Sequence, residues 1–188
     1  MGHWENWYAT HCRSEPSSFA RWVPCVLQPA SVLLEVGCGD GVDAMFYASQ
    51  GHYVTATDPA EIMRPCPFPG DNPQFLKAGA REALGLRAWD AVIGRFVLHA
   101  MPELEAGLFL ESVPKWLSPG GVAAFEFRTN LDGLAADHFR RPVGIADVER
   151  ALLANGNMEL IHSSVGTGRS VLNGEDPALG RVIVRCMK

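Results

Sequence analysis

The segment at residues 33–41 constrains the fold most, because an apolar run there ends in a carboxylate and three alternating glycines follow it. The apolar run is typical of a buried strand, and the stretch after Gly41 is typical of a helix. Gly37, Gly39 and Gly41 lack Cβ atoms, so the backbone can turn tightly and approach a ligand closely. Gly41 comes only two residues after Gly39, whereas the dinucleotide fingerprint has a wider spacing there. This unit, with Glu35 before it, suits an adenosine cofactor.

Short apolar runs alternate with amphipathic stretches along the rest of the chain, which favours a mostly parallel sheet with helices on both faces. We expect strands at residues 31–36, 53–57, 73–77, 89–94, 121–127, 158–165 and 180–187. We expect helices at residues 17–28, 41–50, 103–117 and 145–155. Such open sheets bind their ligands beyond the carboxyl ends of the strands. The sequence therefore predicts a doubly wound α/β domain with its site at that edge.

Composition argues against several classes of protein. A chain of 188 residues is long enough for one domain with a well-buried core. The formal net charge of -5 disfavours binding to nucleic acid, which needs a basic surface. No apolar stretch approaches the roughly 20 residues that cross a bilayer, and no signal peptide is evident, so we expect a cytoplasmic protein without membrane contact. The five cysteines form no Cys-x-x-Cys pair, which predicts free thiols and no metal site.

The Glu-x-Gly-x-Gly-x-Gly pattern at residues 35–41 resembles the first motif of the class I S-adenosylmethionine-dependent methyltransferases. Three later segments are similar to that family as well. They are a strand that ends in Asp58, a strand at 89–94 followed by residues 95–101, and a Leu-Ser-Pro-Gly-Gly turn at 117–121. The resemblance implies a seven-stranded sheet in the order 3-2-1-4-5-7-6, with the last strand antiparallel, and S-adenosylmethionine as the cofactor.

The same resemblance assigns cofactor contacts to individual residues of this chain. Glu35 and the glycines line the amino-acid half of the cofactor, and Asp58 accepts hydrogen bonds from the ribose hydroxyls. The family often has an acid near the position of Ala80 that accepts a hydrogen bond from the adenine amino group. This chain has alanine there, so a backbone N–H around Arg81 is expected to bind the adenine ring instead. The predicted cofactor residues are Glu35, Gly37, Cys38, Gly39, Gly41, Asp58, Pro59, Ala80, Arg81 and Arg95.

Basic side chains collect near the edge where the fourth and fifth strands end. Arg128 ends a strand, and Arg140, Arg141 and Arg169 follow it in the last third of the chain. Guanidinium groups grip carboxylate and phosphate oxygens at two points, so these residues predict a small anionic acceptor held for in-line methyl transfer. The alternative is that Arg140 and Arg141 form an ordinary solvated surface and that Arg169 caps a loop.

Two histidines are candidates for a catalytic base. If the acceptor is a hydroxyl, His99 or His138 can take its proton near neutral pH. The alternative for His99 is a structural ring that packs behind the cofactor. A base is needed only for some acceptors, because the sulfonium leaving group is already activated and the enzyme mainly aligns the reacting atoms.

The N-terminal region carries a cluster of aromatic residues that includes Trp4 and Tyr8. Such rings can cover a sulfonium and contact the acceptor, because aromatic faces attract cations. The alternative is that they anchor this segment to the core. We expect residues 1–30 to form a helical lid segment and residues 31–188 to form the S-adenosylmethionine-binding core.

Two other functions remain open at this point. An NAD-dependent oxidoreductase would share the sheet and the ribose acid, but it would need the wider glycine spacing and a catalytic pair that the sequence does not display. A non-catalytic protein that binds S-adenosylmethionine would keep the cofactor pocket without turnover. Either a monomer or a homodimer is compatible with the sequence.

Overall fold

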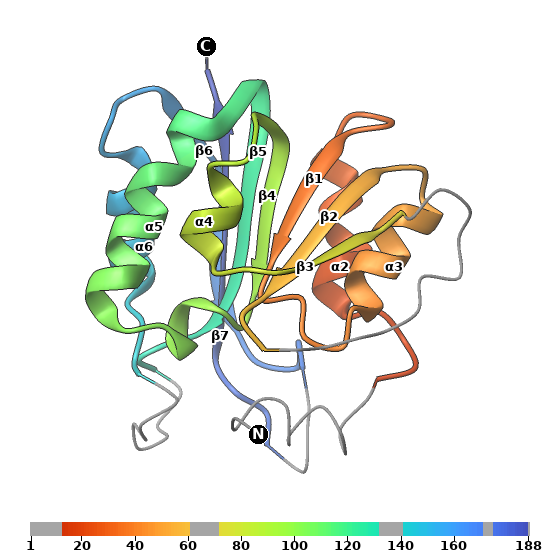
Figure 1. Ribbon diagram of the computed structural model, residues 1–188. Helices are drawn as coiled ribbons and strands as arrows, with labels where there is room; N and C mark the ends of the chain where they lie inside the picture. The colour runs from red at the N-terminus through yellow and green to blue at the C-terminus, as the bar shows by residue number, and fades with distance from the viewer. Residues whose placement is uncertain (1–12, 61–71, 132–140, 171–174, 188) are drawn as a thin grey trace.

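One mixed sheet organises the computed structural model, which describes residues 13–60, 72–131, 141–170 and 175–187. Within these residues the sheet has seven strands in the order β3-β2-β1-β4-β5-β7-β6, and Figure 1 shows them as the central layer. The predicted order is confirmed. The strands are β1 (Val32–Val36), β2 (Tyr53–Asp58), β3 (Gln74–Lys77), β4 (Trp89–Arg95), β5 (Leu117–Arg128), β6 (Met158–Gly166) and β7 (Leu179–Cys186).

The central strands are apolar because helices cover both of their faces. In β1, Leu34 lies opposite Thr55 of β2 and Val92 of β4, and all of these pairings are parallel. Strand β7 runs antiparallel to both β5 and β6, as expected for the last strand. The carboxyl ends of β1, β2 and β4 therefore meet at one edge of the sheet, where the glycine motif begins.

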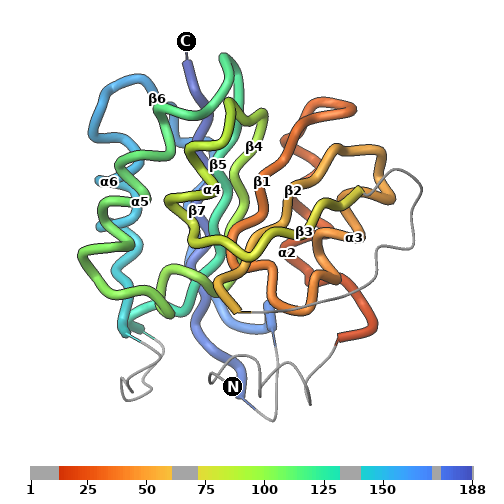
Figure 2. The backbone as a smooth tube through the Cα atoms, in the orientation of Figure 1, coloured from red at the N-terminus to blue at the C-terminus, as the bar shows by residue number. Residues whose placement is uncertain are grey.

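Helices lie on both faces of this sheet, and Figures 1 and 2 allow the two layers to be followed. One face packs against α4 (Ala80–Leu84), α5 (Glu103–Trp116) and α6 (Ile145–Leu153). The other face packs against α2 (Ser18–Trp22), the short 3-10 helix η1 (Val23–Val26) and α3 (Val42–Ser49). Alternation along each strand separates the two cores, because Leu34 belongs to the first and Leu33 to the second.

Two element boundaries differ from the sequence prediction, and one short helix was not predicted. The helix expected at 17–28 is α-helical only to Trp22 and continues as a 3-10 turn that carries Pro24, a residue without an N–H to donate. Helix α4 was not predicted, because five residues are too few to show a helical period. Strand β5 begins at Leu117, directly after α5, and the pairing with β4 shifts register before Val122. The Leu-Ser-Pro-Gly-Gly residues thus lie inside the assigned strand.

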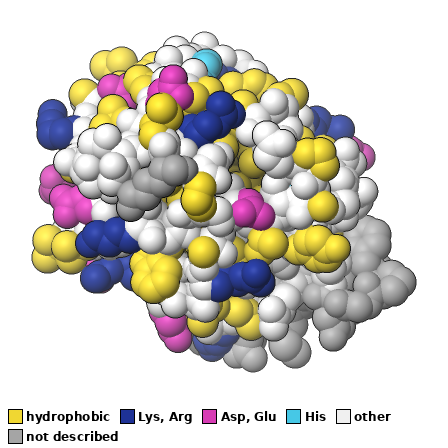
Figure 3. Space-filling view, turned by 90° about the horizontal axis from the view of Figure 1, so that it is seen from above, with side chains coloured by type: hydrophobic (Ala, Val, Ile, Leu, Met, Phe, Trp, Pro, Cys, Tyr) yellow, Lys and Arg dark blue, Asp and Glu magenta, His cyan; other side chains and the backbone are white. Residues whose placement is uncertain are grey.

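The end of the molecule opposite the carboxyl edge carries a mixed surface. Figure 3 views the molecule from that end, where hydrophobic and charged side chains are interspersed. Among the helices of the described residues, none is both long and apolar enough to cross a membrane. The chemically distinctive groups lie at the other edge.

Candidate functional site at the carboxyl edge of the sheet

The loop after β1 depends on its glycines. Gly37, Gly39 and Gly41 have φ angles of +65°, +53° and +71°, a region that other residues rarely adopt. A Cβ on Gly41 would lie 2.7 Å from a ring carbon of Phe75 in β3, and one on Gly37 would lie 3.0 Å from Val97. Both the backbone conformation and the packing therefore require glycine here, and they hold the loop close to the strand ends.

Glu35 is a buried acid directly before this loop. Its side chain is only 3% exposed, and its Oε2 has no hydrogen-bond partner among the described residues. Burial raises the pKa of Glu35 well above its ordinary value, and the nearby charge of Asp43 acts in the same direction. A buried carboxyl oxygen without a partner is costly, so this group is suited to a ligand that brings a positive charge or a donor.

Asp58, at the end of β2, is tied to the glycine loop. Its Oδ2 accepts a hydrogen bond from the backbone N–H of Gly39 at 3.1 Å, and its Oδ1 accepts one from Ala60 at 2.9 Å. These bonds fix the carboxylate at the mouth of the loop, with Pro59 exposed directly after it. Cys38 is buried in the same loop, and burial raises the pKa of its thiol, so it is a packing residue rather than a nucleophile.

An ion-pair network that the sequence analysis missed clamps this loop to the segment before α2. The guanidinium of Arg13 donates to Asp40 at 2.7 Å and to Asp43 at 2.8 Å. Asp43 also accepts from the hydroxyl of Ser17 at 2.7 Å, and that hydroxyl in turn accepts from the N–H of Ala20 as the N-cap of α2. The signal in the sequence was Asp40 between two motif glycines, but its partner lies 27 residues away.

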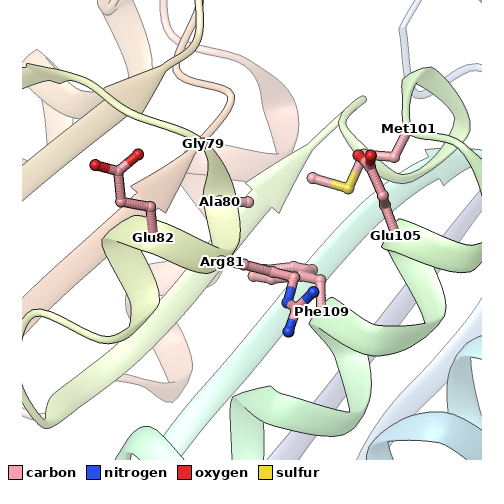
Figure 4. Close-up of a pocket in the computed structure, with 7 residues that line it drawn as sticks. All are labelled: Gly79, Ala80, Arg81, Glu82, Met101, Glu105 and Phe109. Carbon is pink, nitrogen blue, oxygen red and sulfur yellow. The ribbon is translucent and has the colours of Figure 1, made fainter.

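Ala80 and Arg81 lie at a cavity of about 280 Å³ beside the start of α4. Met101 and Phe109 supply apolar walls from the opposite side, and Figure 4 shows these side chains around the space. Two residues predicted to contact adenine are thus brought together at a hollow that has apolar surface for a flat ring. An acid also lines this hollow, because Glu105 of α5 reaches its rim.

Arg95 lies at the end of β4 and is held by residues from other elements. Its Nε donates to Glu126 Oε1 at 2.9 Å, and its Nη2 donates to the hydroxyl of Ser170 at 2.9 Å. Glu126 is fully buried, and its other oxygen accepts from Arg181 Nε at 2.7 Å. Sequence analysis missed Glu126 and Arg181, although a charge inside each of two apolar strands was the available signal.

His99 is buried in the turn after β4 and contacts the end of β5. Its Nδ1 accepts a hydrogen bond from the backbone N–H of Arg128 at 3.2 Å, and its ring packs edge-on against Phe96. In the neutral ring this bond places the proton on Nε2. The ring thereby joins the turn to β5, and Arg141 reinforces that turn by donating to the carbonyls of Met101 and Leu98.

The predicted acceptor residues do not form one group. Arg128 pairs with Glu175, and Arg141 is bound to backbone carbonyls, which leaves both guanidinium groups engaged. Arg169 lies elsewhere, where it contacts Ser164 and the carbonyl of Leu179. Four further predicted residues lie outside the described residues, namely Trp4, Tyr8, His138 and Arg140.

Comparisons with known proteins agree with this geometry. A family model described as a methyltransferase domain matches residues 34–123. No curated protein matches the sequence significantly. Together with the glycine motif and the sheet order, this match supports the resemblance of the chain to the class I S-adenosylmethionine-dependent methyltransferases.

Solved structures share the fold at low identity. A 1,6-didemethyltoxoflavin-N1-methyltransferase from Burkholderia thailandensis, with bound 1,6-didemethyltoxoflavin and S-adenosylhomocysteine, is 20% identical with a TM-score of 0.70 over 92% of this chain and 80% of that chain. Magnesium protoporphyrin IX methyltransferase from Synechocystis PCC 6803, with bound S-adenosylmethionine, is 18% identical with a TM-score of 0.67 over 90% and 76%. A 4+2 cyclase is 15% identical with a TM-score of 0.68 over 97% and 91%. At these identities the likeness concerns the fold, and the cyclase illustrates that one fold hosts different reactions.

Proposed function

We propose that this protein transfers the methyl group of S-adenosylmethionine to a small-molecule acceptor that carries a carboxylate or phosphate. The observation that carries the cofactor side is the partnerless Oε2 of the buried Glu35, beside a loop in which glycine is obligatory. The cofactor is a flexible cation with a sulfonium and an ammonium group, so it supplies the positive charge that this carboxyl lacks. Binding therefore offsets the cost of burying Glu35.

Different residues at the carboxyl edge of the sheet bind different parts of the cofactor. Glu35 holds the ammonium of the amino-acid part, and the glycine loop admits that part close to the backbone. Asp58 receives the ribose hydroxyls, because its carboxylate is fixed at the mouth of the loop. Ala80 and Arg81 border the space for adenine. The bound cofactor supplies an activated methyl group, and this chain's residues supply alignment and the exclusion of water.

His99 has a positioning role in this proposal. Its Nδ1 is already an acceptor for the backbone of Arg128, so in the neutral ring Nε2 carries the proton and cannot receive one from an acceptor hydroxyl. The ring instead fixes the turn after β4 relative to the end of β5, on both sides of the reacting centre. A role as a base requires the opposite tautomer and the loss of that bond.

Two observations support a small acceptor of anionic character. The solved neighbours include methyltransferases named for a porphyrin and for a toxoflavin precursor, both of them small molecules. Arginines are concentrated at the carboxyl edge of a chain whose formal net charge is -5. A local positive field in an acidic protein concentrates small anions near the methyl donor.

Calorimetric titration with S-adenosylmethionine, S-adenosylhomocysteine and NAD tests the cofactor without knowledge of the acceptor. We expect both sulfur compounds to bind and NAD not to bind. A ligand at about 100 times its dissociation constant adds roughly 2.7 kcal/mol to the free energy of unfolding, which a thermal scan detects. Comparable binding of NAD would favour an oxidoreductase instead.

Turnover separates an enzyme from a non-catalytic binding protein. We expect a screen of small carboxylates and phosphates to release S-adenosylhomocysteine, whereas neutral and cationic compounds of similar size should release less. Cofactor binding without turnover on any acceptor class would favour the non-catalytic alternative.

A further inference from the structure

A cluster of charged side chains lies under α2, and of its members only Arg95 belongs to a segment that the sequence motifs include. It consists of Arg95 from β4, Glu126 from β5, Arg181 from β7 and Arg169 from the loop after β6, which we call the arginine cluster. Glu126 is fully buried, and the side chains of Arg95 and Arg181 are only 15% and 13% exposed. These groups are therefore largely withdrawn from water.

The charges of this cluster do not balance. One carboxylate, Glu126, faces the guanidinium groups of Arg95 and Arg181 directly. Arg169 adds a third positive charge beside them, because its Nη2 donates to the hydroxyl of Ser164, which lies opposite Arg181 in the strand register. Ser18 also joins the two arginines, since its hydroxyl accepts from Arg181 Nη2 and donates to the carbonyl of Arg169. Three cations around one anion leave an excess of about two positive charges in a partly desolvated site. Such an excess is destabilising unless an anion compensates it.

Several N–H donors of the arginine cluster are not used by the hydrogen bonds among the described residues. Each guanidinium has five N–H donors. The bonds of Arg95 and Arg181 use Nε and Nη2, so within the described part of the chain the Nη1 groups of both have no partner. Among the described residues, the guanidinium of Arg169 bonds only to neutral acceptors, which are the carbonyls of Ser164 and Leu179 and the Ser164 hydroxyl. These donors are available to carboxylate or phosphate oxygens.

The surroundings hold the cluster rigidly. Arg95 lies 4.0 Å from the centre of the Phe96 ring, and Arg181 lies 5.5 and 5.3 Å from those of Phe19 and Trp22. Phe96 has a φ of +62°, which is strained for a residue with a side chain, and its N–H is held by the Glu126 carbonyl at 2.8 Å. Strain and cation-π contacts of this kind fix guanidinium groups in one orientation before a ligand arrives.

The position of the cluster matches that of an acceptor subsite. Arg95 directly follows Gly94, whose register partner in β1 is Val36, the residue before the glycine loop. The charge of Arg95 also lowers the pKa of Glu35, which places the guanidinium within electrostatic reach of the cofactor acid. The cluster thus borders the amino-acid half of the cofactor, where the methyl group is presented.

We propose that the arginine cluster is the subsite for the carboxylate or phosphate group of the methyl acceptor, with Arg169 and the Nη1 groups of Arg95 and Arg181 as its donors. This inference rests on the proposed function, and it names the residues that select the acceptor. It also explains why Arg128 and Arg141 are poorer choices, because Glu175 and backbone carbonyls engage them.

Titration with two simple anions tests the subsite. Sodium benzoate and inorganic phosphate are titrated at constant ionic strength into the full chain, with and without saturating S-adenosylhomocysteine, and binding is followed by calorimetry. We expect at least one of the two anions to bind, and comparison of the two separates a carboxylate site from a phosphate site. Arg169→Gln should weaken that binding about tenfold or more, because it removes charge-assisted hydrogen bonds.

Arg185→Gln is the matched control for Arg169→Gln. Arg185 lies four residues along β7 from Arg181, on the same face of the sheet but away from the carboxyl edge. Its replacement by Gln removes one positive charge from the protein, as Arg169→Gln does. We expect it to leave anion binding unchanged. Equal effects of the two variants, or no binding of either anion by the parent chain, would overturn the proposed subsite.

Glu126→Gln provides a test with the opposite sign. It removes the negative charge of the cluster and keeps the side chain's shape, so the anion should bind at least as tightly as to the parent. Weaker binding to a variant that remains folded by circular dichroism contradicts the proposal. Because the anion is also titrated alone, failure of S-adenosylhomocysteine to bind defeats the proposed function but still leaves this subsite measurable.

Discussion

The two faces of the sheet bury different kinds of side chain. On the face covered by α4, α5 and α6, the strands contribute apolar groups such as Leu34, Phe125 and Val182. On the face covered by α2 and α3, the carboxyl half of the same strands contributes buried charges, including Glu35 and Glu126. Because residues alternate along a strand, the same segments build both faces. Both faces bury an apolar core, and the second face also places charge at the carboxyl edge of the sheet.

This difference separates stability from binding in a measurable way. Substitutions on the apolar face should lower the free energy of unfolding without a specific effect on ligands. Substitutions on the charged face should change ligand binding, and some should even stabilise the protein without its ligand, because a buried charge without a partner is costly. Three variants test this contrast.

The largest expected effect is on the apolar face. Phe125 is fully buried and packs edge-on against Phe109, with 5.8 Å between the ring centres. Phe125→Ala should lower the free energy of unfolding by about 3–5 kcal/mol, through lost burial and a cavity. Urea unfolding measures this loss, with Leu104→Ala as the control because Leu104 of α5 is 73% exposed. A loss below about 1 kcal/mol would mean that this core is less tightly packed than its burial indicates.

A smaller effect is expected for Asp58 on the charged face, which is the proposed acceptor for the ribose hydroxyls. Asp58→Ala removes an anionic acceptor, so it should weaken binding of S-adenosylhomocysteine by about 1.5–3 kcal/mol, the range for hydrogen bonds to a charged group. Calorimetry measures the affinity, and circular dichroism checks that the variant is folded. Asp147→Ala on the exposed face of α6 is the control. Unchanged affinity would show that the ribose lies elsewhere.

The smallest expected effect has the opposite sign for stability. Burial raises the pKa of Glu35 in the folded state, so its favourable contribution is complete below the unfolded pKa and is lost as the pH rises towards the folded pKa. Glu35→Gln removes this loss and should stabilise the unliganded protein near neutral pH by at least about 1 kcal/mol.

The same variant should bind S-adenosylmethionine more weakly, because the amide cannot pair with the ammonium. Urea unfolding at several pH values, together with calorimetry, measures both effects, and Glu159→Gln on the exposed surface of β6 is the control. A lower free energy of unfolding for Glu35→Gln than for the parent, both without ligand, would contradict the proposal that Glu35 binds a cationic ligand group.

Much of the fold, including the glycine loop at the end of the first strand, could be predicted from the sequence, because those signals are local. The glycine loop, Glu35 and the end of the second strand each lie within a few residues of a recognisable pattern, and the sheet order followed from the resemblance that these patterns carry. The contacts of Glu35, Asp58, Ala80 and Arg81 with the cofactor and the roles of the histidines remain predictions.

Arg95 and Arg169 were predicted as site residues, but their grouping with Glu126 and Arg181 could not be predicted, because the contacts of the arginine cluster join distant parts of the chain. Glu126 meets Arg95 across 31 residues and Arg181 across 55 residues. In the sequence, each of these residues is a single charged residue in a largely apolar strand. No neighbouring residue indicates that the three side chains contact one another in the fold. The network of Arg13 was missed for the same reason, since its partners are 27 and 30 residues away.

The bond between Arg181 and Ser18 has a consequence for the order in which the protein forms during synthesis. It joins the second-layer helix α2 to β7 across 163 residues. On the ribosome, α2, α3 and the first five strands emerge well before β7. Until then, Arg95 is the one cation of the described residues that pairs with Glu126. A nascent chain can therefore assemble the glycine loop early, whereas the charged face is completed only when β7 inserts between β5 and β6.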